Sequence, residues 1–266
     1  MTRCGLVVTT YERPDALARV LEAVSAQSRP PDELVVADDG SGAATRRIVE
    51  QHASRVPYPV RHAWQPHDGF RAGRIRNVAV AGTHCEYLVL LDGDMVPHPD
   101  FLADHVALAR PGHYSQGTRI LLDQSATARL LAPGSRPPGP LSPGLGLRRR
   151  TYAWHAPAAT RLLRDMANAV VAVKACNQGF WRKDLATVNG FDEAITGWGA
   201  EDKELCARLE NAGVLRQTLL FSAIAWHLDH PHAPRSSAGA NRERWQETVR
   251  NGRRRCEAGL DGHPPT

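Results

Sequence analysis

Two aspartates stand two positions apart directly after the most apolar strand-like run of the chain. The run is 87–91 (YLVLL), and Asp92, Gly93 and Asp94 follow it. Alternate residues of an extended backbone point to the same side, so both carboxylates can face one ligand. Carboxylate oxygens suit Mg²⁺ or Mn²⁺, which complete their coordination with substrate phosphates. The pattern indicates a site for a metal and a diphosphate, and a plain Asp-Gly turn is the structural alternative.

A second acidic pair opens an amphipathic run in the segment 197–202 (GWGAED). Its glycines place Trp198 beside Glu201 and Asp202, and an indole face stacks well on the apolar face of a sugar. The alternative is that the two acids only complement the dipole of the helix that follows. His227 follows an apolar run, so it is a candidate third metal ligand or a polar surface residue.

Charged residues at two further element ends complete the candidate set. Asp38 and Asp39 follow the apolar run 34–37. A carboxylate there can accept hydrogen bonds from a base or a ribose, or it can cap the next helix. The segment 69–77 places arginines at a helix start, where phosphate binds well; they are Arg71, Arg74 and Arg76. It lacks the GxGxxG pattern, so a dinucleotide site is unsupported, and a solvated basic face is the alternative.

These residues need a sheet that brings several strand ends together. The runs that predict strands are 5–10, 34–37, 59–64, 87–91, 177–182 and an apolar run ending at 226–227. The patterns that predict helices are 14–24, the mid-40s to 53, 73–81, 200–211 and 242–250. Strands joined by helices form crossovers and a mainly parallel sheet, and such sheets bind ligands at the carboxyl ends of their strands. We expect an α/β fold whose central sheet is mainly parallel and flanked by helices.

Composition excludes several classes of protein. The chain has 266 residues, of which 42% are hydrophobic and 23% charged, so it is not mostly disordered. Its formal net charge is +5, but 28 acidic residues are interspersed with the basic ones, so we expect no nucleic-acid partner. The five cysteines include no CxxC, and no apolar run approaches a membrane span or a signal peptide. We therefore expect reduced thiols and a cytoplasmic location.

Four segments together resemble family 2 glycosyltransferases of the GT-A fold. They are 7–17 (VVTTYERPDAL), 35–41 (VVADDGS), 90–97 (LLDGDMVP) and 189–209 (NGFDEAITGWGAEDKELCARL). The last segment is similar to a C-terminal motif shared by β-1,4-galactosyltransferases and bacterial chondroitin-polymerase-type enzymes. The resemblance runs from about Gly5 to His227.

The resemblance implies a role for each matching residue. A nucleoside-diphosphate sugar is bound by a set at the first strands and the following helix, namely Thr9, Tyr11, Glu12, Asp39, Arg74, Asp92 and Gly93. Glu12 stands where many relatives have Asn. The metal, Mn²⁺ or Mg²⁺, is held by Asp94 and His227. On the acceptor side Trp198 and Glu201 contact the sugar, and Asp202 is the catalytic base.

The resemblance and the composition together indicate how the chain is divided. A single GT-A domain covers 1–230, with a nucleotide-binding part at about 1–122 and an acceptor-binding part at about 166–230. Between them lies a flexible excursion at about 133–150, whose first fifteen residues hold five prolines and four glycines. Residues 231–266 form a basic C-terminal helix and a frayed tail. With seven arginines and four acids, this tail is either solvated or in weak peripheral contact with the inner face of a membrane.

The function that follows is that of a metal-dependent inverting glycosyltransferase. It would move a sugar from a UDP-linked donor, of galactose or N-acetylgalactosamine type, to a hydroxyl of a saccharide or other glycoconjugate. Asp202 favours inversion, because the similar segment of retaining polypeptide GalNAc-transferases carries Asn after the Glu. The alternatives are a sugar nucleotidyltransferase, which should show a glycine-rich loop after the first strand, and a non-catalytic module that binds a sugar or a nucleotide.

Overall fold

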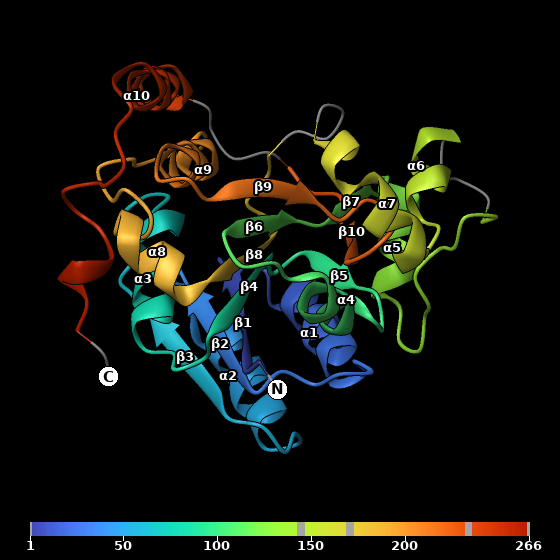
Figure 1. The fold of residues 1–266 in the computed structure, drawn as a ribbon. Coiled ribbons are helices and arrows are strands. Elements are labelled where there is room, and N and C mark those ends of the chain that lie inside the picture. The colour runs from blue at the N-terminus through green and yellow to red at the C-terminus, as the bar shows by residue number, and fades with distance from the viewer. Residues whose placement is uncertain (1, 143–146, 169–172, 232–235, 265–266) are drawn as a thin grey trace.

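The computed structural model describes residues 2–142, 147–168, 173–231 and 236–264 (Figure 1). The strands are β1 (Cys4–Thr10), β2 (Glu33–Asp38), β3 (Val60–Trp64), β4 (Tyr87–Asp92), β5 (Met95–Pro97), β6 (His113–Gln116), β7 (Thr118–Leu121), β8 (Asn177–Trp181), β9 (Leu215–Thr218) and β10 (Ile224–His227). The helices are α1 (Pro14–Ser25), α2 (Ala43–Ala53), α3 (Ala72–Ala81), α4 (Phe101–Leu108), α5 (Gln124–Leu131), α6 (Leu147–Tyr152), α7 (Pro157–Ala167), α8 (Arg182–Val188), α9 (Glu201–Asn211), α10 (Ala238–Asn251) and the short 3₁₀ turn η1 (Leu260–Gly262).

Each strand and helix that the sequence predicts is present within four residues of its expected bounds. The short strands β5, β6, β7 and β9 and the helices α4 to α8 are not predicted by the sequence patterns. Parts of three expected segments lie outside the described residues. These parts are 143–146 in the excursion, 169–172 in the acceptor-binding part, and 232–235 with 265–266 in the tail.

The central sheet has the order β3-β2-β1-β4-β8-β6-β9. The pairs from β3 to β4 are parallel, and β6 and β9 are also parallel to each other. Only β8 runs antiparallel to both of its neighbours. The expected α/β fold with a mainly parallel central sheet flanked by helices is therefore confirmed.

Alternating side chains of the central strands feed two hydrophobic cores. Leu6 and Val8 of β1 face a core that includes residues of α1, α4 and α5. Val7, between them, faces a core built with residues of α3, α8 and α9. The helices consequently cover both faces of the sheet, as Figure 1 shows, and this explains why the central strands are apolar at nearly every position.

A second, smaller sheet has the order β5-β10-β7. Strand β5 is separated from the end of β4 by only Gly93 and Asp94. Its partner β10 runs antiparallel to it, with His227 opposite Met95 and Ala225 opposite Pro97. The small sheet thus brings the end of β10 to the residues that follow β4, across about 130 residues of sequence.

The C-terminal segment packs on the domain, which differs from the frayed tail expected from its composition. Helix α10 lies on α9, on the side away from the central sheet (Figure 1). Beyond α10 the chain returns to α8, where the buried Cys256 donates through its Sγ to the carbonyl of Asn189 at 3.3 Å. The side-chain amide of Asn189 also donates to the carbonyl of Cys256 at 3.0 Å.

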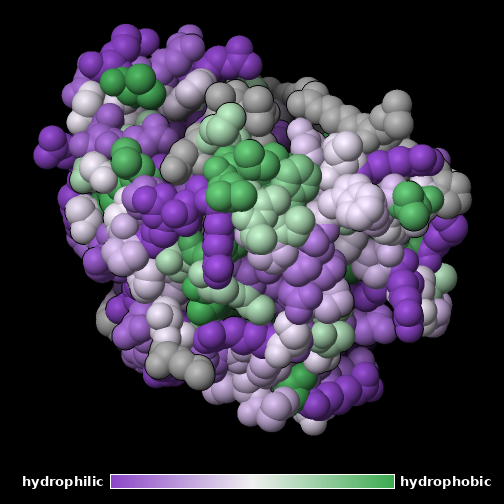
Figure 2. Space-filling model, turned by 45° about the vertical axis from the view of Figure 1, so that its right-hand side comes forward, coloured by the Kyte–Doolittle hydropathy of each residue, from purple (hydrophilic) through white to green (hydrophobic). Residues whose placement is uncertain are grey.

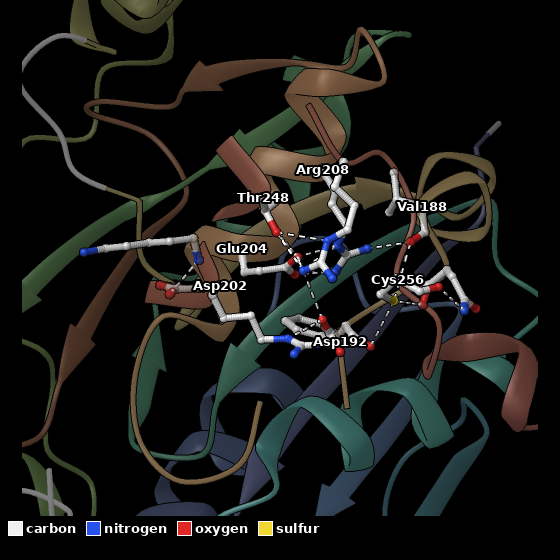
Figure 3. Close-up of polar contacts among 12 residues, drawn as sticks. Val188, Asp192, Asp202, Glu204, Arg208, Thr248 and Cys256 are labelled. Atoms are coloured by element: carbon white, nitrogen blue, oxygen red, sulfur yellow. Dashed lines mark hydrogen bonds and ion pairs between the residues drawn. The ribbon is translucent and has the colours of Figure 1, made fainter. Parts of the chain in front are cut away.

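Buried ion pairs join this segment to α9 (Figure 3). Arg208 and Glu204, both fully buried, form a bidentate pair one helical turn apart, with Nη2 to Oε2 at 2.7 Å. Arg253 donates to Glu204 Oε1 at 2.8 Å and to Asp192 Oδ2 at 3.3 Å. Arg244 of α10 donates to the same Asp192 oxygen at 2.9 Å. Because each buried carboxylate is paired with arginines, the charges can remain in the interior.

This pairing also bears on the expected membrane contact, which is not supported. Arg244, Arg253 and Arg255, three of the seven arginines counted in the tail, donate to acceptors on the folded domain or within the segment itself. These three guanidinium groups thus have partners on the folded chain. Among the described residues, no helix combines the length and the apolar character needed to span a membrane.

The surface in Figure 2 is mainly hydrophilic, with hydrophobic side chains gathered near the middle of the view.

Part of the proline-rich excursion is hydrogen-bonded to β10 and α1. The indole of Trp226 donates to the carbonyl of Pro138 at 3.1 Å, and Arg19 of α1 donates to the carbonyl of Ser135 at 3.1 Å.

Candidate active site

The strand ends meet as the parallel sheet requires. Thr9 of β1 lies opposite Asp92 of β4 in the ladder, and Thr10 lies opposite Asp38 of β2. The backbone of Gly93 lies close to β1, since its N–H donates to the carbonyl of Thr9 at 2.7 Å. A Cβ at this position would come within 3.0 Å of that carbonyl oxygen. Gly93 is therefore needed to let the Asp92–Asp94 turn lie against β1.

Three potential metal ligands gather beside this turn. His230 Nε2 lies 3.1 Å from Asp94 Oδ2, and His227 Nε2 lies 3.7 Å from Asp94 Oδ1. The ligand atoms of all three residues lie within 4.8 Å of one another. Asp94 Oδ1 is buried and accepts no hydrogen bond from the described residues. An imidazole–imidazole–carboxylate set with an unsatisfied oxygen fits a divalent cation.

The protonation states also fit a cation. Burial lowers the pKa of His227 to about 4, against the opposing charge of Asp94, so its imidazole is neutral at pH 7 and able to coordinate. Burial opposes ionisation of Asp94, but the hydrogen bond from His230 and the nearby positive charges outweigh it and lower the pKa of Asp94. The hydrogen bond to Asp94 raises the pKa of His230. A cation would replace the proton that this pair shares.

Arg76 links the two acidic motifs. Its side chain is only 4% exposed, and its guanidinium donates to Asp92 Oδ1 at 2.8 Å and to Glu201 Oε1 at 3.4 Å. Its Nε donates to Thr9 Oγ1 at 3.1 Å, and the cation lies 5.4 Å from the centre of the Phe191 ring. One buried arginine thus joins residues from β1, β4 and α9, which are up to 192 positions apart in sequence.

Helix α9 presents the second acidic pair at its first turn. Asp202 Oδ2 accepts a hydrogen bond from the backbone N–H of Ala175 at 2.9 Å, and Oδ1 accepts one from Lys203 N at 2.8 Å. Burial raises the pKa of Glu201 to about 6; the charge of Asp202 acts in the same direction and that of Arg76 opposes it. Trp198, three residues before Glu201, keeps 39% of its surface exposed. The start of α9 therefore offers two carboxylates in different environments, and an accessible indole precedes them by three and four positions in the sequence.

The residues expected to hold the nucleoside line the ends of β1 and β2. Tyr11 is exposed and stacks on the ring of His67, with ring centres 4.4 Å apart. Asp39 is buried and accepts hydrogen bonds from the Gln65 amide at 2.5 Å and from the backbone N–H of Arg71 at 2.8 Å. The carboxylate of Glu12 accepts from the N–H of Gly42, at the start of α2, at 2.8 Å.

Arg74 and Arg76 take different directions from the same helix. Arg74 donates to Gln65 Oε1 at 2.6 Å and lies 3.7 Å from Glu193 Oε2, at the edge of the site. Arg76, in contrast, points into the site and contacts Asp92 and Glu201. The helical period contains the signal, since Ala72 and Val80, four residues to either side of Arg76, are both buried.

The sequence motifs assigned no role to His230. It follows His227 by three positions, and the short segment after β10 brings both imidazoles to Asp94. The remaining sequence-predicted residues, Thr9, Asp92, Asp94, Glu201, Asp202 and His227, are brought to one region through the contacts of Arg76 and the small sheet.

Comparisons with known proteins identify the family of the chain. The model of the family described as Glycosyl transferase family 2 matches residues 6–179, and the model described as the N-terminal domain of galactosyltransferase matches residues 170–230. The chain is 26% identical to a hyaluronan synthase of Pasteurella multocida over 85% of its own length and 24% of that protein. It is 28% identical to a validoxylamine A glucosyltransferase of Streptomyces hygroscopicus subsp. limoneus over 86% of its length and 51% of the relative. The chain thus spans about half the length of these curated relatives, or less.

Among solved structures the chain resembles S. aureus TarS 1–349 in complex with UDP, with a TM-score of 0.64 at 17% sequence identity. The match covers 98% of this chain and 68% of TarS 1–349. The expected GT-A fold is confirmed. Since the family model matches well over half of its residues, this chain belongs to glycosyl transferase family 2.

Proposed function

We propose that the protein is a metal-dependent, inverting glycosyltransferase that moves one sugar from a UDP-linked donor to a hydroxyl of a saccharide or other glycoconjugate. The observation that carries the proposal is the position of Arg76, which ties Asp92 of the first acidic motif to Glu201 of the second. A donor bound at the strand ends and an acceptor bound at the start of α9 would then meet at one place. Galactose or N-acetylgalactosamine is the sugar we favour, on the match to the galactosyltransferase family.

The metal is assigned to Asp94, His227 and His230. This set fits because it joins a carboxylate with an unsatisfied oxygen to two imidazoles, one of them neutral at pH 7. When bound, Mn²⁺ or Mg²⁺ supplies Lewis-acid neutralisation of the charge on the departing diphosphate. Asp92 lies two residues before Asp94, and its carboxylate accepts a hydrogen bond from Arg76.

The chain's own residues divide the donor side from the acceptor side. Tyr11, Asp39 and Thr9 lie at the strand ends where a nucleoside would be held, with Glu12 supporting the loop at Gly42. Arg74 stands at the edge of the same site. On the acceptor side the indole of Trp198 offers a stacking face and Glu201 can hold a hydroxyl.

Asp202 is assigned as the base. It would take the proton of the acceptor hydroxyl as that oxygen attacks the anomeric carbon from the face opposite the diphosphate. The backbone N–H of Ala175 holds its Oδ2 in place at 2.9 Å. One displacement with one base inverts the anomeric configuration.

The two alternative functions make different predictions. A sugar nucleotidyltransferase needs a glycine-rich loop after β1, and residues 11–14 (YERP) contain no glycine. A non-catalytic module would bind UDP with metal but release none from a donor. Measuring UDP release from a panel of UDP-sugars with Mn²⁺, with and without acceptor, separates these functions.

Asp202→Asn tests the assignment of the base. It keeps the shape and the acceptor oxygen for Ala175 N–H, so UDP and Mn²⁺ should bind within a few-fold of wild type. Turnover should fall by about 10²–10⁴-fold, the usual contribution of a general base. Binding is measured by titration calorimetry, and the anomeric configuration of the wild-type product by NMR. Retained turnover, or a product with the donor's configuration, would contradict the mechanism.

A further inference from the structure

The pair of strands β5 and β10 carries histidine–carboxylate clusters at both of its ends. Asp94 and His227 lie at one end, in the candidate active site. At the other end, His98 follows β5, and its N–H donates to the carbonyl of Ile224 at 2.8 Å. At about 3.4 Å per residue, the ends of this pair lie roughly 10–13 Å apart. The second cluster is therefore separate from the active site.

His98, Asp100 and His155 form this second cluster. Asp100 Oδ2 lies 3.7 Å from His98 Nδ1 and 3.9 Å from His155 Nδ1. The three ligand atoms lie within 4.8 Å of one another, and the two imidazole rings stack with centres 4.5 Å apart. His98 and Asp100 come from the turn between β5 and α4, whereas His155 comes from the connection between α6 and α7.

The hydrogen bonds of His155 direct its free nitrogen into the cluster. Its Nε2 lies 2.9 Å and 3.1 Å from the two carboxylate oxygens of Asp104, so it carries a proton. Asp104 is buried, and its Oδ2 also accepts from the backbone N–H of Ala223 at 2.8 Å. In a neutral imidazole this leaves a lone pair on Nδ1, the atom that faces Asp100. A histidine whose other nitrogen donates to a carboxylate is the usual arrangement of a metal ligand.

The other two residues also present lone pairs. Asp100 Oδ1 accepts from the hydroxyl of Ser28 at 2.7 Å, which leaves Oδ2 facing the imidazoles. His98 Nδ1 accepts a 3.1 Å hydrogen bond from the backbone N–H of Asp100, so it is unprotonated. A cation would share or displace the one backbone hydrogen bond.

We propose that His98, Asp100 and His155 bind a second divalent cation of the zinc type, with Asp104 as the residue that orients His155. Two imidazoles and one carboxylate are typical ligands of Zn²⁺. This cluster lies away from the place where diphosphate oxygens would complete the coordination of Mn²⁺ or Mg²⁺ in the active site. Tetrahedral ligands at 2.0–2.1 Å are separated by roughly 3.4 Å. The two imidazole nitrogens, at 3.7 Å and 3.9 Å from Asp100 Oδ2, therefore each need to approach this oxygen by about half an ångström or less. The fourth position is left to water.

The bound ion would connect parts of the chain that are distant in sequence. The backbone of the α6–α7 connection already touches this region, since Ala156 N–H donates to the carbonyl of Phe221 at 2.8 Å. A zinc ion would join that connection to the turn after β5. It would thereby anchor the chain that leaves the proline-rich excursion to the strand pair whose other end carries Asp94 and His227.

A metal-free explanation of the cluster makes a distinct prediction. A protonated His155 could bridge Asp104 and Asp100 as an imidazolium, with no metal required. The cluster would then bind Zn²⁺ no better than isolated surface histidines do.

Zinc titration in an Asp94→Asn background distinguishes these explanations, because this change removes the carboxylate of the first metal set. Calorimetry with ZnCl₂ should then detect one site, and Co²⁺ should give the visible absorption of a tetrahedral ion. Adding His155→Asn or Asp100→Asn should weaken zinc binding by about 30-fold or more. Adding His84→Asn, at an exposed histidine, should change it less than about twofold.

Asp100 is 41% exposed, so its substitution should leave the fold intact, as circular dichroism can check. Zinc binding that is equal in the Asp94→Asn protein and in its His155→Asn and Asp100→Asn derivatives would overturn the second site. So would the absence of any zinc site in the Asp94→Asn protein. Neither result would alter the proposed transfer reaction, which does not use these residues.

Discussion

Arg76 brings a full positive charge between Asp92 and Glu201. Its contacts at 2.8 Å with Asp92 and at 3.4 Å with Glu201 offset the repulsion between the two acidic motifs. Arg remains protonated under such conditions, and its planar fork can serve two partners at once. Lysine at this position would offer a single point charge and could not hold both motifs.

At the residue scale the metal assignment gives the first prediction. Transfer should stop in excess EDTA and resume with Mn²⁺ or Mg²⁺. His230→Asn should weaken the apparent Mn²⁺ affinity more than about tenfold, or about 1.4 kcal/mol, because it removes the imidazole nearest to Asp94. Mn²⁺ titration followed by electron paramagnetic resonance measures this, with His84→Asn as control. Identical titration curves for His230→Asn and wild type would exclude His230 from the site.

Glu201 gives a prediction about pH and stability. Its pKa is about 6 in the folded protein, above the 4.5 of an unperturbed glutamate, because burial disfavours its charge. The folded state therefore loses stability as the pH rises from about 4.5 to above 6, by about 2 kcal/mol. Glu201→Gln should stabilise the protein by up to that amount at pH 8 and hardly at pH 4. It should also raise the acceptor KM.

Urea unfolding at several pH values measures the effect of Glu201→Gln. Glu243→Gln, on the exposed face of α10, is a suitable control and should show no such dependence. A stability difference that is the same at pH 4 and pH 8 would mean that the charge of Glu201 is not the cause.

At the element scale, helix α9 begins from a strained position. Ala200, the residue before the helix, has a φ of +69°, in the left-handed region that glycine adopts more easily. Its carbonyl nevertheless accepts the first helical hydrogen bond, from Glu204 N at 2.9 Å. The helix therefore starts abruptly, and Glu201 and Asp202 occupy its first turn.

Ala200→Gly should stabilise the protein by about 0.5–1 kcal/mol, because the relief of backbone strain exceeds the added chain entropy of glycine. Ala44→Gly, in the first turn of α2 and exposed, should destabilise it by a similar amount. Thermal unfolding of the two variants compares these opposite signs. A loss of stability in both would show that Ala200 is not strained.

At the scale of the whole molecule, the C-terminal segment supports the helix that carries the proposed base. Helix α10 and the residues after it reach α9 and the loop before it through Glu204 and Asp192, both fully buried. Asp202 lies on the same helix as Glu204, two residues earlier (Figure 3). Charged residues of the tail thus hold it against the folded domain. The composition of the tail alone could not distinguish this arrangement from a solvated tail.

Arg253 and Arg254 provide a matched pair for this interaction. Arg253→Leu leaves Glu204 and Asp192 with fewer partners and should cost about 2–3 kcal/mol, less than a fully buried pair because Arg208 and Arg244 remain. The exposed neighbour change, Arg254→Leu, should alter stability by less than about 0.5 kcal/mol. Chemical denaturation measures both. Equal losses of stability in the two variants would mean that the buried ion pairs of Arg253 do not stabilise the folded protein.

The amino-acid sequence by itself determined the order of elements up to the end of β4, the mainly parallel sheet and the two acidic motifs. It could do so because strands buried on both faces are continuous apolar runs, as in residues 87–91, and because parallel ladders place their carboxyl ends at one edge. The family resemblance added the assignments of Asp94, Glu201 and Asp202, which remain predictions about function.

Only the tertiary structure decided which of the charged residues meet. Arg74 and Arg76 are two positions apart on α3, and the packing of this helix against the sheet turns Arg76 toward Asp92 and Arg74 toward Gln65. His230 and His155 acquire their partners from strands and helices far away in sequence. In the sequence, the arginines after residue 231 have the pattern of a solvated charged segment. In the structure, the packing of α10 on α9 gives Arg244 and Arg253 buried carboxylate partners. Long-range pairing depends on the three-dimensional path of the chain, which local residue patterns do not encode.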